Sequence, residues 1–158
     1  MYYCYMDSPI GKLLLAGDET ALELISFPTG SMRREPEDEW QYSEDPFGDV
    51  ISQINEYFEG KRHSFDLPLR PNGTEFQLAV LDELLRIPYG ETTSYGEVAT
   101  RLGRPKASRA VGAANGRNPI PIIIPCHRVV GSKCELTGFG GGIETKKTLL
   151  ELERGFRQ

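Results

Sequence analysis

The sequence predicts an α+β fold: a small β-rich N-terminal domain with one helix, then a mostly helical, winged-helix-like C-terminal domain that contains a helix-turn-helix. Short apolar runs between turn residues fill residues 2–27, which is typical of strands in a small sheet. Capped segments of helix-forming residues follow the middle of the chain. Between these two parts, residues 68–73 contain two prolines and a glycine, which predicts a linker.

The N-terminal domain is expected to cover residues 1–67. Pro46 is suited to the first turn of a helix that continues to about Glu59, with apolar side chains at helical spacing. Residues 33–45 are polar and acidic, which favours an exposed loop with Trp40 as a possible anchor. Turn-forming residues separate the apolar runs and should reverse the chain between them. The predicted strands are residues 2–6, 11–17, 20–27 and 64–66.

The C-terminal domain, residues 74–158, begins with capping signals. Thr74 is a suitable N-cap for a helix over residues 75–87. Ser94 is followed three residues later by Glu97, a capping-box pattern that predicts the start of a short helix. These signals fix where two of the helices should begin.

A helix-turn-helix pattern follows, because a tight turn at residues 103–106 joins that short helix to a second one over residues 107–115. The second helix consists of Ala, Ser, Gly and Val apart from one arginine and one asparagine. Such small residues let its backbone approach closely either a binding partner or a neighbouring helix, and the pattern alone favours neither. A last helix is expected over residues 144–153.

The composition is that of a globular protein, with 39% hydrophobic and 26% charged residues. No apolar run approaches the roughly 20 residues needed to span a membrane, and the N-terminus lacks the features of a signal peptide. The 3 cysteines are an odd number without metal-ligand spacing. We therefore expect a cytoplasmic protein, nucleoid-associated if bacterial, with no membrane partner, no disulfide framework, no metal and no cofactor.

Charge is distributed unevenly along the chain, although the net charge is -5. Residues 1–70 hold 6 Lys and Arg against 14 Asp and Glu, a balance of -8, whereas residues 71–158 hold 12 against 9, a balance of +3. Between Val98 and Cys134 there are seven basic residues and no acidic one. Local positive charge, not the total, determines affinity for phosphates. The asymmetry suggests an acidic N-terminal part and a phosphate-facing C-terminal part.

The most distinctive stretch is residues 118–131, an apolar run with three prolines that leads into Pro-Cys-His-Arg. Because Pro125 disfavours helical geometry at the residue before it, we expect this run to be extended and buried. A thiol becomes a good nucleophile where positive charge or a base stabilises its thiolate. Cys126, followed by His127 and Arg128, is therefore predicted to be a reactive cysteine with a lowered pKa.

To act as a base, His127 would need a route to the thiol proton of Cys126 and a partner that orients its ring. Because its side chain and that of Cys126 diverge from neighbouring backbone positions, a bridging water is a more natural coupling than a direct hydrogen bond. A catalytic histidine also usually has an orienting carboxylate. The last helix offers Glu151 and Glu153 as candidates.

Residues 124–130, Ile-Pro-Cys-His-Arg-Val-Val, resemble the active-site signature of the O6-alkylguanine-DNA alkyltransferases, also called methylated-DNA–protein-cysteine methyltransferases. The resemblance covers roughly residues 74–153, and the N-terminal part resembles the family more loosely. It implies that Cys126 takes the alkyl group from guanine O6 irreversibly, once per molecule. It also implies that His127, acting through water and oriented by Glu153, removes the thiol proton, while Asn118 holds the active-site turn.

The resemblance further implies double-stranded DNA as the partner, with the recognition helix in the minor groove and the damaged base flipped out. Arg109 would enter the base stack, and Tyr95 would crowd the adjoining phosphate. The implied DNA-binding residues are Tyr95, Arg104, Ala107, Arg109 and Ser132.

The implied substrate pocket contains Val129, Phe139 and Gly140. Phe139 stands where the family usually has tyrosine, so a hydroxyl that would donate toward the guanine ring is lost. Gly140 stands where serine or alanine is common, which gives a roomier pocket. We therefore predict weaker stabilisation of the departing guanine and tolerance of alkyl groups bulkier than methyl.

The expected function is repair of O6-alkylguanine, with O4-alkylthymine as an open second substrate, by a single-turnover, monomeric methylated-DNA–protein-cysteine S-methyltransferase. One alternative is a non-catalytic lesion-sensing protein, but such relatives replace the cysteine. A second is a transcription regulator, which needs no Pro-Cys-His-Arg and in this family carries an additional metal-binding domain. The presence of Cys126 favours repair.

Overall fold

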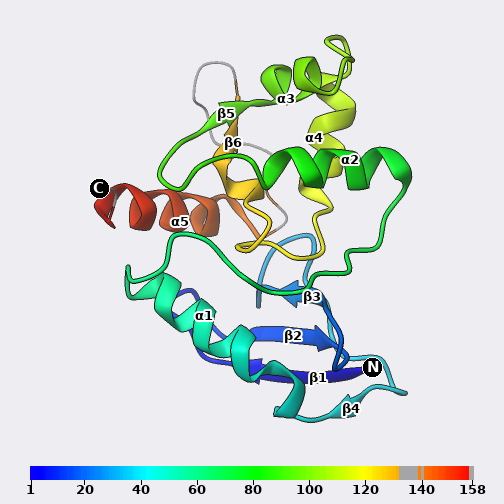
Figure 1. Ribbon diagram of the computed structural model, residues 1–158, viewed down its shortest axis with the longest axis vertical. Helices are drawn as coiled ribbons and strands as arrows, with labels where there is room; N and C mark the ends of the chain where they lie inside the picture. Colours follow the sequence, from blue (N-terminus) through cyan, green and yellow to red (C-terminus); the bar gives the residue numbers. More distant parts are fainter. Residues whose placement is uncertain (132–138, 140, 157–158) are drawn as a thin grey trace.

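The computed structural model describes residues 1–131, 139 and 141–156. A four-stranded sheet with one long helix forms the N-terminal part, and helices dominate the C-terminal part (Figure 1), which confirms the predicted α+β class. The sheet has the order β3-β2-β1-β4, in which only β4 pairs parallel to its neighbour. Its strands are β1 (Tyr2–Met6), β2 (Leu13–Gly17), β3 (Leu22–Ser26) and β4 (Gln41–Tyr42).

Both faces of the sheet are covered, which explains why every residue of β2 is buried. On one face Cys4, Leu15 and Ile25 are aligned across three strands and belong to the main core. On the other face Leu14, Ala16 and Leu24 form a smaller core with Trp40, which is 9% exposed. Trp40 thus anchors the segment expected to be a loop, and the prediction missed that this segment also contains β4.

Helix α1 (Gly48–Phe58) follows a short 3-10 helix, η1 (Asp45–Phe47), in which Pro46 occupies the first turn. The strand expected at residues 64–66 is wrong. The carboxamide of Gln53, on α1, takes both backbone hydrogen bonds of Asp66: its Nε2 donates to the carbonyl at 3.0 Å, and its Oε1 accepts from the N–H at 2.9 Å. This backbone therefore pairs with a helix side chain instead of with a strand.

The segment expected to be a linker pairs with the sheet edge. The N–H of Leu22 in β3 donates to the Pro68 carbonyl at 3.0 Å, and the Arg70 N–H donates to the Leu22 carbonyl at 2.8 Å. The Arg70 guanidinium also contacts Asp18 at 2.9 Å and Glu23 at 3.3 Å. The chain that joins the two parts is therefore held to β3.

The C-terminal part contains two capped helices at the predicted positions. The Thr74 hydroxyl accepts from the Gln77 N–H at 3.1 Å, and the Gln77 side chain accepts from the Thr74 N–H at 2.9 Å, which completes a capping box. The Ser94 hydroxyl accepts from the Glu97 N–H at 3.1 Å. The elements are α2 (Glu75–Leu84), β5 (Thr93–Ser94), α3 (Tyr95–Arg101), α4 (Ser108–Gly116), η2 (Cys126–Arg128), β6 (Val129–Val130) and α5 (Ile143–Phe156).

The apolar run before Cys126 is buried as expected, but it is not extended. The Ile123 N–H donates to the Pro121 carbonyl at 2.9 Å, and the Ile124 N–H donates to the Ile120 carbonyl at 3.0 Å. Ile122 has a φ of 74°, an uncommon left-handed conformation for a β-branched residue. Because prolines cannot donate to a strand ladder, the run folds into consecutive turns.

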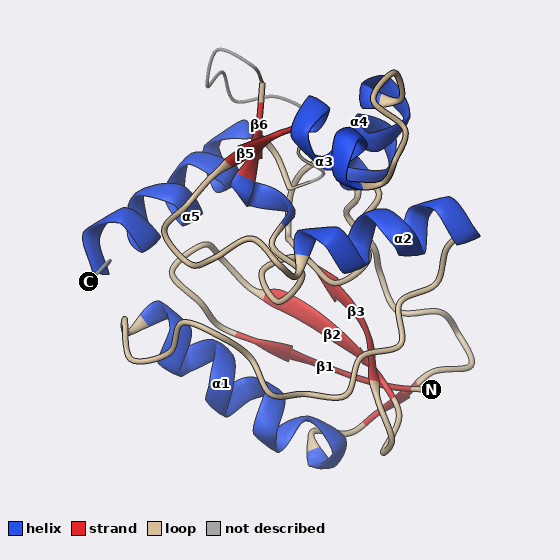
Figure 2. Ribbon diagram, turned by 45° about the horizontal axis from the view of Figure 1, so that its top comes forward, coloured by secondary structure: helices blue, strands red, loops and turns tan. Residues whose placement is uncertain are grey.

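One hydrophobic core joins the two parts, with members from the sheet, α1, α2, α4 and α5. Figure 2 shows α1 along one side of the sheet and the C-terminal helices grouped beyond β3. A hydrogen bond from the Ile25 N–H in β3 to the Pro119 carbonyl, 2.9 Å long, ties the sheet to the turns before Cys126. No helix within the described residues is long and apolar enough to cross a membrane.

Candidate active site

Cys126 begins the 3-10 helix η2 and is 3% exposed. The Asn118 Nδ2 donates to the Ile124 carbonyl at 2.7 Å, and its Oδ1 accepts from the Ile120 N–H at 3.0 Å. The Asn115 Nδ2, from α4, donates to the Cys126 carbonyl at 3.3 Å. Two buried asparagines thus hold the turns on which the thiol sits. Asn118 was predicted from the sequence to hold this turn, but Asn115 was given no such role.

The expectation of a lowered thiol pKa is wrong for this state of the protein. Burial raises the pKa of Cys126 to about 11, and a hydrogen bond from Asn118 and the charge of Lys146 only partly oppose this effect. Arg128, which the sequence placed near the sulfur, instead binds Glu153. At neutral pH the sulfur is therefore a thiol, and it can act as a nucleophile only if a base takes its proton.

Glu153, on α5, is the carboxylate that orients His127. The His127 Nε2 lies 2.6 Å from Glu153 Oε2. The Arg128 Nε donates to Oε1 at 2.8 Å, and its Nη2 donates to Oε2 at 3.0 Å. All three side chains are buried, whereas Glu151 on the same helix is exposed. Of the two candidates, the structure therefore brings only Glu153 to His127.

Two more donors reach the same carboxylate. The Tyr57 hydroxyl, on α1, donates to Oε2 at 2.6 Å, and the Gly90 N–H donates to Oε1 at 3.2 Å. Tyr57 lies on the helix that was predicted to follow Pro46, but no role at this site was predicted for it from the sequence. Its sequence distance from Glu153 left no local signal for this hydrogen bond.

Burial and nearby charges determine the protonation states of Glu153 and His127. Burial alone would raise the pKa of Glu153, but hydrogen bonds and charge from His127 and Arg128 outweigh it and lower the pKa. Burial lowers the pKa of His127 more than Glu153 raises it. A neutral imidazole beside a carboxylate carries its proton on Nε2, because that nitrogen has to donate. Nδ1 then has a lone pair, and no described side chain or backbone group binds it.

Lys146 is a buried cation beside this site that the sequence analysis missed. Its Nζ donates to the Val129 carbonyl at 2.5 Å and lies 5.9 Å from the centre of the Tyr95 ring. Burial lowers its pKa to about 8, although Cys126 opposes this shift. Helical spacing was the available signal, since Lys146 and Glu153 are seven residues apart and so share the inward stripe of α5.

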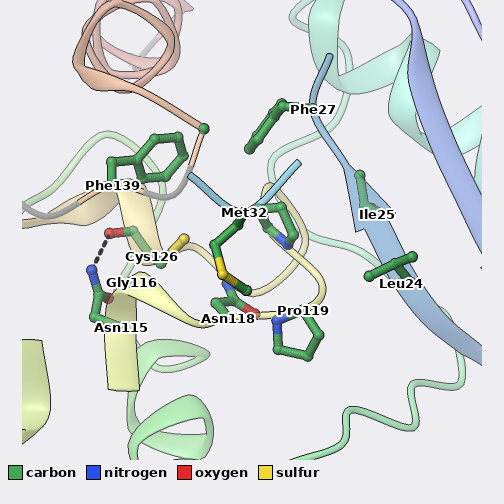
Figure 3. Close-up of a pocket in the computed structure, with 12 residues that line it drawn as sticks. Leu24, Ile25, Phe27, Met32, Asn115, Gly116, Asn118, Pro119, Cys126 and Phe139 are labelled. Carbon is green, nitrogen blue, oxygen red and sulfur yellow. Dashed lines mark hydrogen bonds between the residues drawn. The ribbon is translucent and has the colours of Figure 1, made fainter. Parts of the chain in front are cut away.

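A small space beside Cys126 is lined by both parts of the chain. Figure 3 shows Cys126 and Phe139 on one side, Phe27 and Ile25 from the N-terminal part on the other, and Met32 between them. The Phe27 and Phe139 ring centres are 5.6 Å apart. The free volume is about 20 Å³, enough for about one water molecule and far less than a purine needs.

The structure describes only some of the other residues that were predicted to line the substrate pocket or to contact DNA. Val129 is buried in β6, with its carbonyl bound by Lys146. Gly140 and Ser132 lie outside the described residues. Within the described residues, no cluster of three or more His, Cys, Asp and Glu side chains could hold a metal ion.

Helices α3 and α4 present a surface of small side chains with basic residues. Arg109 is exposed in the first turn of α4, and Ala110 and Ala113 are exposed on the same helix. Arg104 is exposed in the turn before α4, with its guanidinium 5.6 Å from the centre of the Phe76 ring, and Ala107 is partly buried at the N-cap. Because α4 also supplies Asn115, this helix connects that surface to Cys126.

Tyr95 begins α3 and lies against α4. A Cβ at Gly112 would be 3.8 Å from the Tyr95 ring, which is ordinary van der Waals contact. Close packing against a neighbouring helix therefore accounts for Gly112, which lies beside α3, whereas Ala110 and Ala113 are exposed and make no such contact necessary.

Comparisons with known proteins give matches over nearly the whole chain. Residues 1–71 match the ribonuclease-like domain of 6-O-methylguanine DNA methyltransferase, and residues 75–155 match its DNA-binding domain. A methylated-DNA–protein-cysteine methyltransferase of Methanosarcina acetivorans is 52% identical over 153 residues, which covers 97% of this chain and 98% of that protein.

Solved structures have a similar fold over nearly the whole chain. The crystal structure of Mycobacterium tuberculosis OGT in complex with DNA has a TM-score of 0.93 and 47% identity, and the match covers 99% of this chain and 94% of that one. An O6-methylguanine DNA methyltransferase from Methanococcus jannaschii has a TM-score of 0.67 and 29% identity, with 96% and 93% covered.

Proposed function

The chain belongs to the 6-O-methylguanine DNA methyltransferase family, and we propose that Cys126 is the residue to which it transfers the alkyl group. The protein is a methylated-DNA–protein-cysteine methyltransferase that repairs DNA by alkyl transfer to a cysteine. One observation supports Cys126 above all: it is buried next to a histidine that is held by a carboxylate at 2.6 Å.

In the proposed mechanism, the lone pair on His127 Nδ1 accepts the thiol proton of Cys126 through one water molecule. Glu153 holds the imidazole from Nε2 and stabilises its positive charge. The sulfur attacks the alkyl carbon, so an S–C bond forms while the bond to guanine O6 breaks. The departing guanine takes up the proton from His127. Because the product is a thioether, the protein acts once, as a single-turnover enzyme.

The proposed substrate is O6-alkylguanine in double-stranded DNA. The exposed alanines of α4 suit close approach to a narrow minor groove, with Arg109 beside them to enter the base stack. Tyr95, Arg104, Ala107 and Ser132 are the other proposed DNA contacts. The flipped guanine would lie against Cys126, Val129, Phe139 and Gly140, and Asn118 keeps its proposed role in holding the turn.

Binding of the flipped base requires the pocket to open, because the free volume beside Cys126 is smaller than a purine. Met32 and Phe27, which come from the N-terminal part, are the side chains that would have to move apart from Phe139 (Figure 3). We also propose that residues 1–67, 68–73 and 74–158 are the two domains and their linker, and that the protein acts as a monomer in the cytoplasm.

The test uses an O6-methylguanine oligonucleotide and the mass of the intact protein. The wild type should gain the mass of one methylene group, and Cys126→Ala should gain none. Cys4→Ala is the matched control, since Cys4 is also a buried free thiol, and it should react like the wild type. Methylation of Cys126→Ala would contradict the assignment of the acceptor, and tight binding without any mass gain in the wild type would favour a lesion sensor.

A further inference from the structure

Tyr57 is a buried tyrosine of the N-terminal part that reaches the carboxylate of the active site. Its side chain is 0% exposed, and its hydroxyl donates to Glu153 Oε2 at 2.6 Å. The same oxygen receives His127 Nε2, also at 2.6 Å. Two short hydrogen bonds therefore share one carboxylate oxygen, and one of them comes from a different part of the fold.

The Tyr57 ring is fixed by its neighbours. Its centre lies 5.3 Å from that of Phe58 and 5.6 Å from that of Phe65. Burial and the nearby charge of Glu153 raise the pKa of Tyr57 well above its ordinary value. The hydroxyl thus remains a donor over the whole pH range in which the protein works.

A donor to a carboxylate stabilises its charge and reduces the negative charge offered to other partners. Tyr57 therefore weakens the pull of Glu153 on a proton at His127. The other charged groups around His127 are Arg128 on η2 and Lys146 on α5, and both disfavour its protonated form. Tyr89, beside Arg128, is another tyrosine that faces this cluster, and Tyr95 lies against Lys146.

We infer that Tyr57 is a positioning residue for the transfer reaction: it fixes Glu153 and limits how strongly His127 holds a proton, so that Nδ1 is available as a base. The inference rests on the proposed role of His127 in activating Cys126. It gives the N-terminal part a direct effect on the chemistry, through one side chain.

The first experiment measures the single-turnover rate of methyl transfer against pH for the wild type and Tyr57→Phe. Loss of the hydrogen bond makes Glu153 a stronger partner for the imidazolium, so the acidic limb of the profile should move to higher pH by on the order of half a unit to one unit. The rate should fall several-fold at about pH 6 and stay within about two-fold at about pH 8.5. A merely structural role would change the rate equally at every pH.

Tyr89→Phe is the matched control. The Tyr89 hydroxyl is buried and has no hydrogen-bond partner within the described part of the chain, and its ring centre is 6.2 Å from that of Tyr57. The same chemical change beside the same cluster should leave the acidic limb where it is. An equal shift in both variants would overturn the inference.

The second experiment does not depend on activity. The chain has 2 histidines, so the imidazole signals of His127 and His63 can be separated by NMR with one His63→Gln sample. The pKa of His127 should be higher in Tyr57→Phe than in the wild type and Tyr89→Phe. Identical titration of His127 in all three folded proteins would overturn the inference even if methyl transfer is normal. An inactive wild type with the expected NMR shift would instead contradict only the proposed function.

A replacement of Tyr57 by a ring-fluorinated tyrosine covers the case in which Tyr57→Phe does not fold. Its hydroxyl is more acidic and so donates more strongly to Glu153. The titration of His127 and the acidic limb of the rate should then both move to lower pH. Movement to higher pH, or none, would count against the inference.

Discussion

Glu153 joins several groups of the candidate active site through hydrogen bonds. Its two oxygens accept hydrogen bonds from Tyr57, Gly90, His127 and Arg128. Replacement of one member of a buried ion pair leaves the other charged and unpaired in a medium that solvates it poorly. Here the group left behind would be the Arg128 guanidinium, which also donates to the Ile87 carbonyl at 2.7 Å.

Glu153→Gln should therefore lower the free energy of unfolding by about 3–5 kcal/mol at pH 7 and slow methyl transfer. Glu151→Gln, two residues away and exposed, should change that free energy by less than about 0.5 kcal/mol. Urea unfolding at a series of pH values checks both variants. Equal stability of Glu153→Gln and Glu151→Gln would show that the buried pair contributes nothing.

The difference in unfolding free energy between the wild type and Glu153→Gln should change with pH in a defined direction. Because the pKa of Glu153 is lowered in the folded protein, its contribution is fully present above its ordinary pKa of 4.5 and is lost as the pH falls through the folded value. The gap between wild type and Glu153→Gln should thus be largest near neutral pH and shrink in acid. Since the pKa of His127 is lowered as well, wild-type stability should begin to fall already below 6.5.

At the scale of elements, local signals predicted what local interactions determine. Thr74 and Ser94 cap their helices as expected, because each hydroxyl binds an N–H three residues away. The strand at residues 64–66 could not be excluded from the sequence, since Gln53, which binds that backbone, is 13 residues distant. The turns before Cys126 were likewise missed, because the carbonyls that satisfy them belong to a proline-rich run that can also be extended.

Thr74→Ala should lower the free energy of unfolding by about 1 kcal/mol, because the N-cap acceptor of α2 is lost. Thr100→Ala is the matched control: this exposed threonine lies inside α3, where its hydroxyl binds the Gly96 carbonyl at 2.9 Å. Alanine has the higher helix propensity at such a position, so the control should be neutral or slightly stabilised. Chemical denaturation of both variants checks this, and an equal loss in both would contradict a specific capping role.

At the scale of the whole molecule, the contacts between the two parts were the least predictable feature. Cys126, His127 and Glu153 were indicated by the sequence because they belong to a distinctive pattern. Tyr57 was not, because its partner Glu153 is 96 residues away along the chain. The same holds for Phe27 and Met32, which close the space beside Cys126 from the N-terminal part.

The central claim is that Cys126 is a single-use acceptor of the alkyl group. The most direct measurement is the amount of isotope-labelled methyl transferred from excess O6-methylguanine DNA, followed by digestion and location of the label among the cysteine-containing peptides. The account predicts that transfer stops at one methyl group per protein molecule, all of it on the peptide that contains Cys126. Continued turnover, or label on a peptide with Cys4 or Cys134, would contradict it.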